Sequence, residues 1–143
     1  TIAVNLSGPA HLLQGAIPHL ESAGGGHIVN ITSRGAFRGE PDAPAYGASK
    51  AGLNSLGQSL AVALAPKGIH VVSIAPGWVL TDKQKELWAD PASLAAHLDK
   101  QCLKEHLVEQ DVVDATLFLA SNTSRMMTGQ TLAVDGGVVT VAA

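Results

Sequence analysis

The sequence predicts an α/β protein with a parallel β-sheet, and three observations lead to this prediction. Short apolar runs at 27–32 and 69–75 have the length and composition of buried strands. Between them, leucines recur along one face of a predicted helix at 46–65. A strand, a helix and a second strand in this order form a right-handed parallel crossover. With 46% apolar but only 3% aromatic residues, the core must consist mainly of Ala, Val, Ile and Leu.

The other elements follow from local signals. The first segment has apolar residues at near-helical spacing, with Pro9 at a kink or at a late helix start. A Gly-, Pro- and Asp-rich loop follows the first strand. Weaker helical signals after the second strand break around Asp90-Pro91, and a clearer helix precedes a last strand and turn. In order, we expect a helix at 1–22, a loop at 33–45, broken helices over 83–104, a helix at 111–121 and a strand and turn within 130–137.

Composition limits the partners. The net charge is -3 and the nine Lys and Arg are scattered, so we expect neither nucleic acid nor an anionic membrane as a partner. No run is long and apolar enough to cross a bilayer. The single Cys102 cannot form an internal disulfide, which fits a cytoplasmic protein. The six His lack the spacing of metal ligands, so no metal site is expected.

The topology predicts where a ligand binds. In an open parallel sheet, ligands occupy the crevice beyond the carboxyl ends of the strands. Two loops leave such ends here, at 33–45 and 76–90. Ser33 begins the first loop, and Tyr46 and Lys50 lie where that loop enters the next helix. These side chains should therefore converge on one crevice with the second loop.

Tyr46 and Lys50 are an i, i+4 pair and share one face of the predicted helix. A free phenol titrates near pH ~10, and a nearby ammonium stabilises the phenolate and makes tyrosine a usable proton shuttle. Ser33 adds a hydroxyl that can hold a substrate oxygen beside the phenol. These residues suit proton transfer at an oxygen while hydride transfer occurs at the attached carbon. The hydride must come from a cofactor, because no side chain supplies one.

These residues resemble the pattern of the short-chain dehydrogenases/reductases: Ser, twelve residues, Tyr, three residues, Lys. The segments IVNITS (28–33) and YGASKAGL (46–53) match it at Ser33, Tyr46 and Lys50. Further matches are VNLSG at 4–8, PGWVLT at 76–81, FLAS at 118–121 and TGQTLAVDGG at 128–137. The resemblance covers nearly the whole chain. It implies the C-terminal half of a Rossmann-type doubly wound parallel sheet.

The resemblance also implies roles for individual residues. Asn5 would hold a water that links Lys50 to a proton relay. Gly35 and Gly39 suit loop geometry better than phosphate binding, and Arg34 and Arg38 are expected to be solvated charges. The implied catalytic set is Asn5, Ser33, Tyr46 and Lys50; the NAD or NADP contacts are Tyr46, Lys50, Pro76, Gly77, Val79 and Thr81; and the candidate substrate contacts are Ser33, Gly35, Trp78 and Trp88.

Substrate choice in this family lies largely after Pro76-Gly77. The runs TDKQKELW (81–88) and QCLKEHLV (101–108) resemble the aldose 1-dehydrogenases, which oxidise an anomeric hydroxyl to a lactone. Trp78 and Trp88 would supply an apolar wall for a sugar ring, or simply pack under a mobile segment. Two alternatives stay open. One is a 3-oxoacyl or hydroxysteroid-type ketone reductase, and the other is a catalytically silent chain that acts only in oligomerisation.

The family's glycine-rich dinucleotide fingerprint is missing from this sequence. The run GGGH at 24–27 precedes a strand, whereas the fingerprint follows one. We therefore expect residues 1–143 to be a single domain that forms the C-terminal part of a longer dehydrogenase and is inactive alone. The strands at 27–32 and 69–75 would then lack neighbours. The small residues Ala48, Gly52, Ser55 and Ser59, with the helix at 1–22, resemble the family's dimer interface and imply a homodimer or tetramer.

Overall fold

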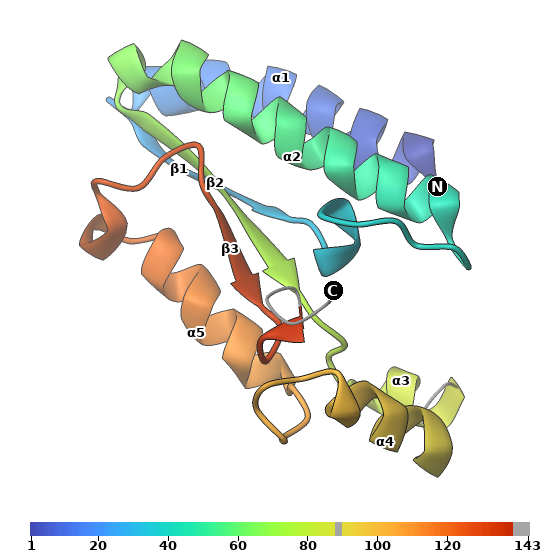
Figure 1. The fold of residues 1–143 in the computed structure, drawn as a ribbon. Helices are drawn as coiled ribbons and strands as arrows, with labels where there is room; N and C mark the ends of the chain where they lie inside the picture. The colour runs from blue at the N-terminus through green and yellow to red at the C-terminus, as the bar shows by residue number, and fades with distance from the viewer. Residues whose placement is uncertain (88–89, 139–143) are drawn as a thin grey trace.

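The computed structural model describes residues 1–87 and 90–138 (Figure 1). Three parallel strands form one sheet in the order β1-β2-β3, and their bounds are β1 (Gly26–Ile31), β2 (Ile69–Pro76) and β3 (Thr131–Val134). The helix α2 (Pro44–Leu64) connects β1 to β2. This is the predicted parallel crossover, so the predicted α/β class is confirmed.

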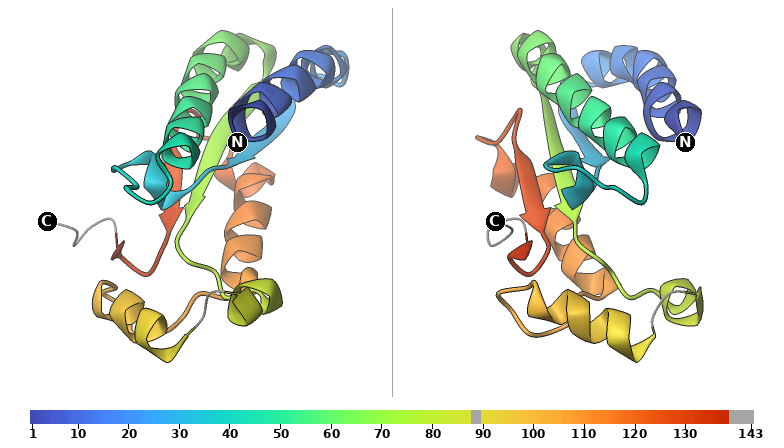
Figure 2. Two further views of the ribbon diagram at one scale, coloured as in Figure 1. Left: turned by 90° about the vertical axis from the view of Figure 1, so that its right-hand side faces the viewer. Right: turned by 45° about the vertical axis from the view of Figure 1, so that its right-hand side comes forward.

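Helices cover both faces of the sheet. Figure 2 shows α1 (Gly8–Ser22) and α2 on one face and α5 (Glu109–Leu119) on the other. The central strand β2 contributes to both cores, because Ile69 and Val71 face α1 and α2 while Val72 and Ile74 face α5. This double burial explains why the sequence of β2 is a nearly continuous apolar run. The sheet is therefore doubly wound, as predicted.

The first helix begins differently from a regular α-helix. Residues Ala3–Ser7 form a π-helical turn, and α1 follows directly with Pro9 in its first turn. Proline is tolerated at this junction because the π-helical turn, in which the Gly8 N–H donates to the Ala3 carbonyl, already departs from the i to i−4 hydrogen-bond pattern. The predicted helix at 1–22 is therefore present, as a π-helical turn that continues directly into α1. Asn5 lies within the π-helical turn, a geometry that occurs frequently at functional sites.

Two short helices occupy the region of broken helical signals, α3 (Asp82–Leu87) and α4 (Pro91–Asp99). Figure 1 shows both beyond the carboxyl ends of β2 and β3. The break falls where the sequence predicts it, since the Asp90 carboxylate accepts hydrogen bonds from the first backbone N–H groups of α4. The described part of the chain also contains three single turns: η2 (Arg34–Ala36), η3 (Ala65–Lys67) and η4 (Asn122–Ser124).

The expectation that both first strands lack neighbours is wrong for β2. Its edges pair with β1 on one side and β3 on the other, because the C-terminal strand returns beside it. Within residues 1–87 and 90–138, β1 pairs only with β2, and Ile31 at its end is exposed. In the same ranges, no helix combines the length and the hydropathy that crossing a membrane requires.

Candidate active site

Lys50 lies in the second turn of α2, directly above Tyr46. Its Nζ atom is 5.7 Å from the centroid of the Tyr46 ring and donates a hydrogen bond of 2.9 Å to the Ile31 carbonyl at the end of β1. Burial lowers the pKa of the Lys50 ammonium from its ordinary value. The predicted pair is therefore brought together at the carboxyl end of a strand, with one of the three Lys50 donors already used.

Ser49 connects Asn5 to the same helix, and sequence reasoning missed it. The Asn5 side-chain Nδ2 donates to Ser49 Oγ at 3.2 Å, and that hydroxyl donates to the Tyr46 carbonyl at 2.7 Å. Ser49 is fully buried. A small polar residue three positions after the tyrosine, on the face toward the first helix, is the signal that could have identified it. The contact fixes the π-helical turn against the helix that carries Tyr46 and Lys50.

The backbone of Asn5 has a second notable property. In an α-helix, the N–H group of residue 9 would donate to the carbonyl of residue 5, but Pro9 has no N–H group. The Asn5 carbonyl therefore has no α-helical donor four residues later.

Ser33 forms the N-cap of η2, where its Oγ accepts the Gly35 N–H at 3.1 Å. Because Ser33 Oγ is the acceptor in this hydrogen bond, its own hydroxyl proton is not used there and can be donated to a substrate oxygen. A Cβ on Gly47 would lie 3.4 Å from the Gly35 carbonyl, so η2 rests on the first turns of α2. The turn that carries Ser33 therefore packs against the helix that carries Tyr46.

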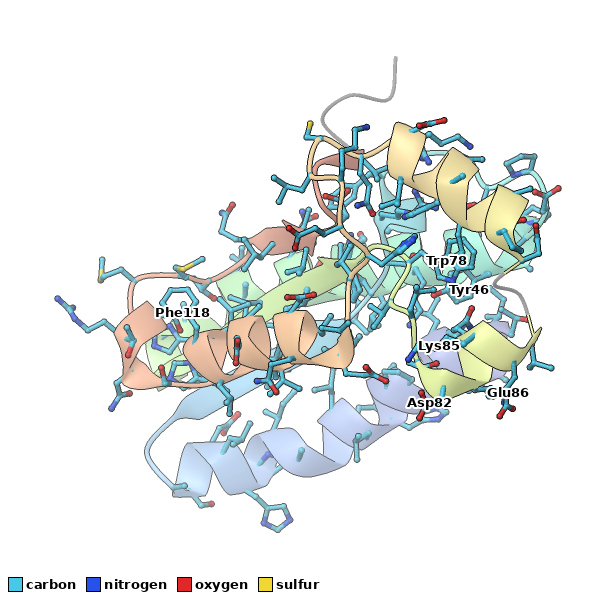
Figure 3. The ribbon with its side chains drawn as sticks, turned by 90° about the horizontal axis from the view of Figure 1, so that it is seen from below. Tyr46, Trp78, Asp82, Lys85, Glu86 and Phe118 are labelled. Carbon is cyan, nitrogen blue, oxygen red and sulfur yellow. The ribbon has the colours of Figure 1, made fainter. Side chains whose placement is uncertain are left out.

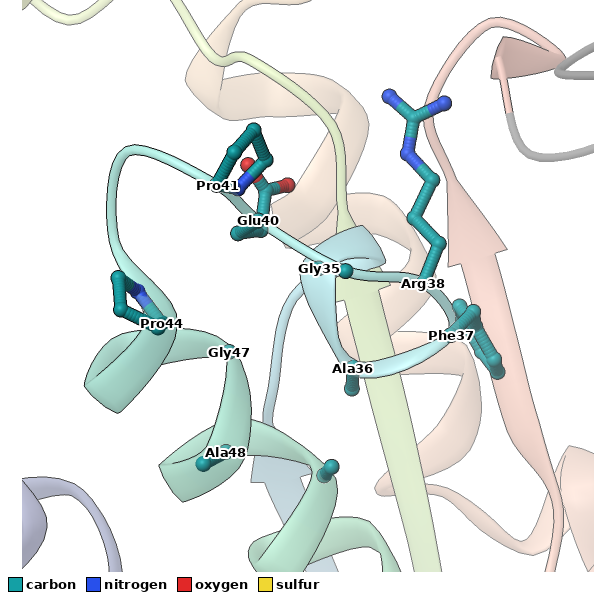
Figure 4. A pocket seen from close by; sticks show the side chains of 11 residues that line it. Gly35, Ala36, Phe37, Arg38, Glu40, Pro41, Pro44, Gly47 and Ala48 are labelled. Atoms are coloured by element: carbon teal, nitrogen blue, oxygen red, sulfur yellow. The ribbon is translucent and has the colours of Figure 1, made fainter.

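Gly35 has a structural reason to be glycine. A Cβ at this position would lie 2.8 Å from Glu40 Cγ, so a side chain would displace the loop. Figure 4 shows Gly35 and Glu40 at the edge of a hollow of about 640 Å³ between the loop and the start of α2. This packing agrees with the expected role in loop geometry.

The segment after β2 is held by backbone hydrogen bonds. Gly77 N–H donates to the Val134 carbonyl at 2.8 Å, and a Cβ on Gly77 would lie 2.9 Å from Asp135 Cα. Val79 forms a parallel bridge with Leu107. Thr81 Oγ1 accepts the Gln84 N–H at 3.2 Å and so caps the start of α3, which leaves the hydroxyl proton available. Packing alone therefore requires glycine at position 77.

Trp78 joins the exit of β2 to the two outer helices. Its Nε1–H donates to Gln84 Oε1 at 3.0 Å, and its ring meets His97 of α4 edge-on, with the centroids 5.2 Å apart. Figure 3 shows Trp78 with the charged side chains Asp82, Lys85 and Glu86 of α3. The other candidate wall residue, Trp88, lies outside the described residues.

Arg34 does not have the solvated environment that we expect from the sequence. Its Nη1 atom is buried without a hydrogen-bond partner among the described residues, whereas Arg38 is exposed as expected. His97 Nε2 and Gln101 Oε1, in α4 and just after it, are also buried, and a hydrogen bond with the Gln101 side chain acts on the His97 imidazole. No local pattern in the sequence marks these residues, because their burial depends on the packing of segments that lie far apart in the chain. Residues 1–87 and 90–138 contain no group of three or more side chains that could hold a metal ion.

Comparisons with known proteins agree with this geometry. The family model described as enoyl-(acyl carrier protein) reductase matches residues 1–139. Among curated relatives, the probable galactose dehydrogenase GalD of Rhizobium meliloti (strain 1021) is 42% identical over 96% of this chain and 54% of its own length. The L-xylulose reductase of Caenorhabditis elegans is 39% identical over 96% of this chain and 55% of its own length.

Solved structures give the same result. A gluconate 5-dehydrogenase from Burkholderia cenocepacia J2315, in complex with NADP and tartrate, superposes with a TM-score of 0.91 at 29% identity, covering 97% of this chain and 55% of the other. A 4-hydroxyisoleucine dehydrogenase mutant complexed with NADH and succinate has a TM-score of 0.90 at 31% identity, covering 96% and 57%. The chain thus spans about half the length of the relatives that it matches. It belongs to the short-chain dehydrogenase/reductase family.

Proposed function

We propose that this chain supplies the proton-transfer and substrate-binding part of an NAD- or NADP-dependent dehydrogenase that oxidises a hydroxyl group of an aldose. The proposal depends on one observation above all. Lys50, with its pKa lowered by burial, lies over the Tyr46 ring at the carboxyl end of β1. The dinucleotide fingerprint is not among these 143 residues, so the proposed activity belongs to a complete gene product that also carries it.

The proposed mechanism assigns each side chain a task at the substrate oxygen. Ser33 donates its hydroxyl proton to that oxygen and holds it in place. Tyr46, as phenolate, removes the proton from the substrate hydroxyl. The hydrogen on the attached carbon leaves with both bonding electrons, as a hydride, for the nicotinamide. The Lys50 ammonium stabilises the phenolate. The proton taken up by Tyr46 then passes by way of Lys50 to a water at Asn5 and on to solvent, which restores both side chains. The products are a carbonyl compound, which is a lactone for an anomeric hydroxyl, and one released proton.

The residues present fit a nicotinamide dinucleotide in part. The Lys50 ammonium keeps two donors beyond its bond to Ile31, and the Thr81 hydroxyl keeps its proton. Together with Tyr46, Pro76, Gly77 and Val79, these groups would hold the nicotinamide half. The bound cofactor supplies the acceptor for the hydride. Solved relatives with NADP and with NADH support either dinucleotide.

The relatives' names support a sugar substrate. One is named a galactose dehydrogenase and another an L-xylulose reductase, and both act on polyhydroxylated molecules by name. A second candidate is an acyl or ketone reductase, which the description of the matching family model favours. The third candidate is a catalytically silent chain that acts only in oligomerisation. The Lys50–Tyr46 pair does not support it, because oligomerisation does not require these two side chains.

A substrate panel tests the proposal. NAD and NADP reduction is followed at 340 nm with the complete gene product, using aldoses in one set and secondary alcohols or 3-hydroxyacyl compounds in the other. We expect aldose turnover, and Tyr46→Phe should reduce it by roughly 10²- to 10⁴-fold because the proton acceptor is lost. Turnover of the second set alone would assign the protein to the ketone reductases. The absence of turnover in both sets would favour the silent chain.

We also propose that the protein forms a homodimer or homotetramer in the cytoplasm. The exposed face of α2 carries Ala48, Ser55 and Ser59, whereas Gly52 is already in contact with Leu6 of the same chain. Val62 is an exposed apolar residue of α2, and Leu12 is exposed on α1. Small residues allow two helices to approach closely. Light scattering coupled to size exclusion measures the oligomeric state, and Ala48→Glu should shift it toward monomers.

A further inference from the structure

Ser49 lies outside the catalytic set that the family resemblance implies, but it is completely buried beside two members of that set. It comes three positions after Tyr46 and directly before Lys50 in α2. A serine without solvent access costs free energy unless its hydroxyl is hydrogen-bonded, and alanine is the better helix former. The hydroxyl at this position therefore requires an explanation.

The Ser49 hydroxyl forms two hydrogen bonds, and their direction is fixed. Its Oγ lies 2.7 Å from the Tyr46 carbonyl oxygen and 3.2 Å from Asn5 Nδ2. Two oxygens at such a short distance repel unless a proton lies between them, so the single Ser49 proton is donated to the carbonyl. The lone pairs of Oγ then accept from the Asn5 amide. The hydrogen bonds therefore run from Asn5 through Ser49 to Tyr46 and fix which end of the Asn5 amide faces α2.

The Tyr46 carbonyl connects the backbones of Tyr46 and Lys50. In an α-helix, the carbonyl of residue 46 also accepts the N–H group of residue 50. A displacement of this carbonyl therefore moves the backbone of both residues. The distance of 5.7 Å from Lys50 Nζ to the centre of the Tyr46 ring, and the bond from Nζ to the Ile31 carbonyl, depend on that backbone. The Ser49 hydroxyl is bonded at the atom through which it can position both side chains.

An apolar contact holds the same two segments together. A Cβ on Gly52 would lie 2.9 Å from Leu6 Cδ2, so the π-helical turn lies directly against α2. Figure 2 shows the N-terminal segment alongside this helix. Ser49 and Gly52 are three residues apart and share one face of α2. Glycine at position 52 allows the close approach that brings Asn5 within hydrogen-bond distance of Ser49.

We propose that Ser49 is a positioning residue for proton transfer, which links the placement of Asn5 to that of Tyr46 and Lys50. The inference rests on the proposed function and adds to it a residue that touches neither substrate nor cofactor. Its hydroxyl is buried and its proton is used within α2, so Ser49 does not itself carry the transferred proton. Loss of the hydroxyl should therefore change kcat and its pH dependence but should change KM little.

The test uses the complete gene product and compares Ser49→Ala with Ser49→Cys and Ser22→Ala. Ser22 is the matched control, because its hydroxyl also donates to a helix carbonyl, that of Pro18 at 2.9 Å, but is exposed. For Ser49→Ala we expect kcat for the aldose to fall by about 10- to 100-fold, the order of effect that misplaced catalytic groups produce. Ser22→Ala should keep the wild-type kcat.

The pH profile distinguishes positioning from a merely structural contribution. In Ser49→Ala, the pH at which kcat is half-maximal should rise, because an ammonium that is held less accurately stabilises the Tyr46 phenolate less. Cysteine is similar in size to serine and keeps a weaker donor and acceptor. Ser49→Cys should therefore recover part of the loss in kcat and part of the shift in pH.

A double-mutant cycle with Asn5→Ala tests the connection to Asn5. This variant keeps the backbone of residue 5 and removes the amide that donates to Ser49. If both side chains act through one series of hydrogen bonds, the double variant should be about as slow as the slower single variant. Rate losses that multiply would show independent roles and would overturn the proposal.

The other outcomes separate the positioning role from the proposed function. Aldose turnover by Ser49→Ala with the kcat and pH profile of Ser22→Ala overturns the positioning role and leaves the proposed function standing. A lower kcat with an unchanged pH profile and no recovery in Ser49→Cys also overturns it, in favour of a structural contribution. No turnover of any aldose by the wild-type protein overturns the proposed function and the positioning role with it. If circular dichroism shows that Ser49→Ala is unfolded, Ser49→Cys against wild type provides the same pH comparison.

Discussion

The sheet with α1, α2 and α5, which we call the body, is held together differently from residues 82–87 and 90–107, which we call the outer segment. In the body, buried apolar side chains on both faces of β2 form two cores. The outer helices α3 and α4 share few contacts with the body's strands and helices. Hydrogen bonds from polar side chains hold the two ends of α4 instead, from Asp90 at its start and from Lys104 at its end.

Under the proposed function, this difference separates two tasks. Tyr46, Ser49 and Lys50 lie on α2, which packs against the sheet through buried apolar side chains. Their positions therefore depend on the packing of the body. His97 lies on α4 and Gln101 lies just after it, in a segment whose position depends on local hydrogen bonds. Proton transfer needs accurate placement, whereas substrate selection tolerates a segment that varies in sequence. Substitutions in the body should therefore change kcat or stability, and those in the outer segment should change KM.

Lys50→Met should give the largest effect and should separate catalysis from stability within the body. We expect kcat to fall by roughly 10²- to 10⁴-fold, because the phenolate of Tyr46 loses its cation. Stability at neutral pH should rise, since the folded protein no longer buries an ammonium. The sign follows from the lowered pKa: the folded state binds fewer protons than the unfolded state as pH approaches 10.5, so the wild-type penalty is complete at low pH and disappears as pH rises past 10.5.

Kinetics at saturating aldose and urea unfolding measured from pH 7 upward check both effects. Lys83→Met is the control, because Lys83 is exposed on α3. A stability difference between wild type and Lys50→Met that stays constant with pH would contradict the assignment of this penalty to the ammonium.

Ile74→Ala tests the cohesion of the body. Ile74 is fully buried at the centre of β2, and removing its side chain should destabilise the protein by about 2–5 kcal/mol through lost burial and a residual cavity. Leu117→Ala is the matched control, because Leu117 is 64% exposed on α5 and its loss should change stability by less than about 0.5 kcal/mol. Urea unfolding followed by circular dichroism measures both, and equal effects would mean that the α5 face is not the core described here.

The body could be predicted from the sequence, and much of the outer segment could not. Period and length identify β1, β2 and α2, because their apolar residues face a core that spans the whole sheet. Asp90-Pro91 also predicts the start of α4, since helix capping is local. The environment of Arg34 is not local, because the charges that act on it include Asp135 after β3, and no spacing in the sequence predicts that approach. Ser49 is an intermediate case, because its helical position is predictable but its partner Asn5 is 44 residues away.

Lys104→Met should weaken the outer segment without affecting the body. Lys104 Nζ donates to the carbonyls of Leu98 and Gln101 at 2.8 and 2.6 Å, and a cation at a helix C-terminus also interacts favourably with the helix dipole. We expect a loss of about 1 kcal/mol in the local stability of α4, measured by hydrogen exchange of its amides. KM for the aldose should rise while kcat stays near the wild-type value. Unchanged exchange in α4, or an equal increase in β2, would contradict the separation of the two regions.

Asp90→Asn should give the smallest effect, and that effect should depend on pH. The hydrogen bond from the Ser93 hydroxyl, followed by those from the Ser93 and Ala92 backbone N–H groups, lowers the pKa of Asp90 below 3.8. The carboxylate therefore stabilises the start of α4 at pH values above 3.8, and this contribution is lost as pH falls through the lowered pKa. Asparagine keeps a side-chain oxygen for capping but has no charge. Exchange of the Ala92 and Ser93 amides should thus be severalfold faster in Asp90→Asn than in wild type at neutral pH and should converge with it in acid. A difference that persists in acid would show that side-chain geometry, and not charge, holds the outer helix in place.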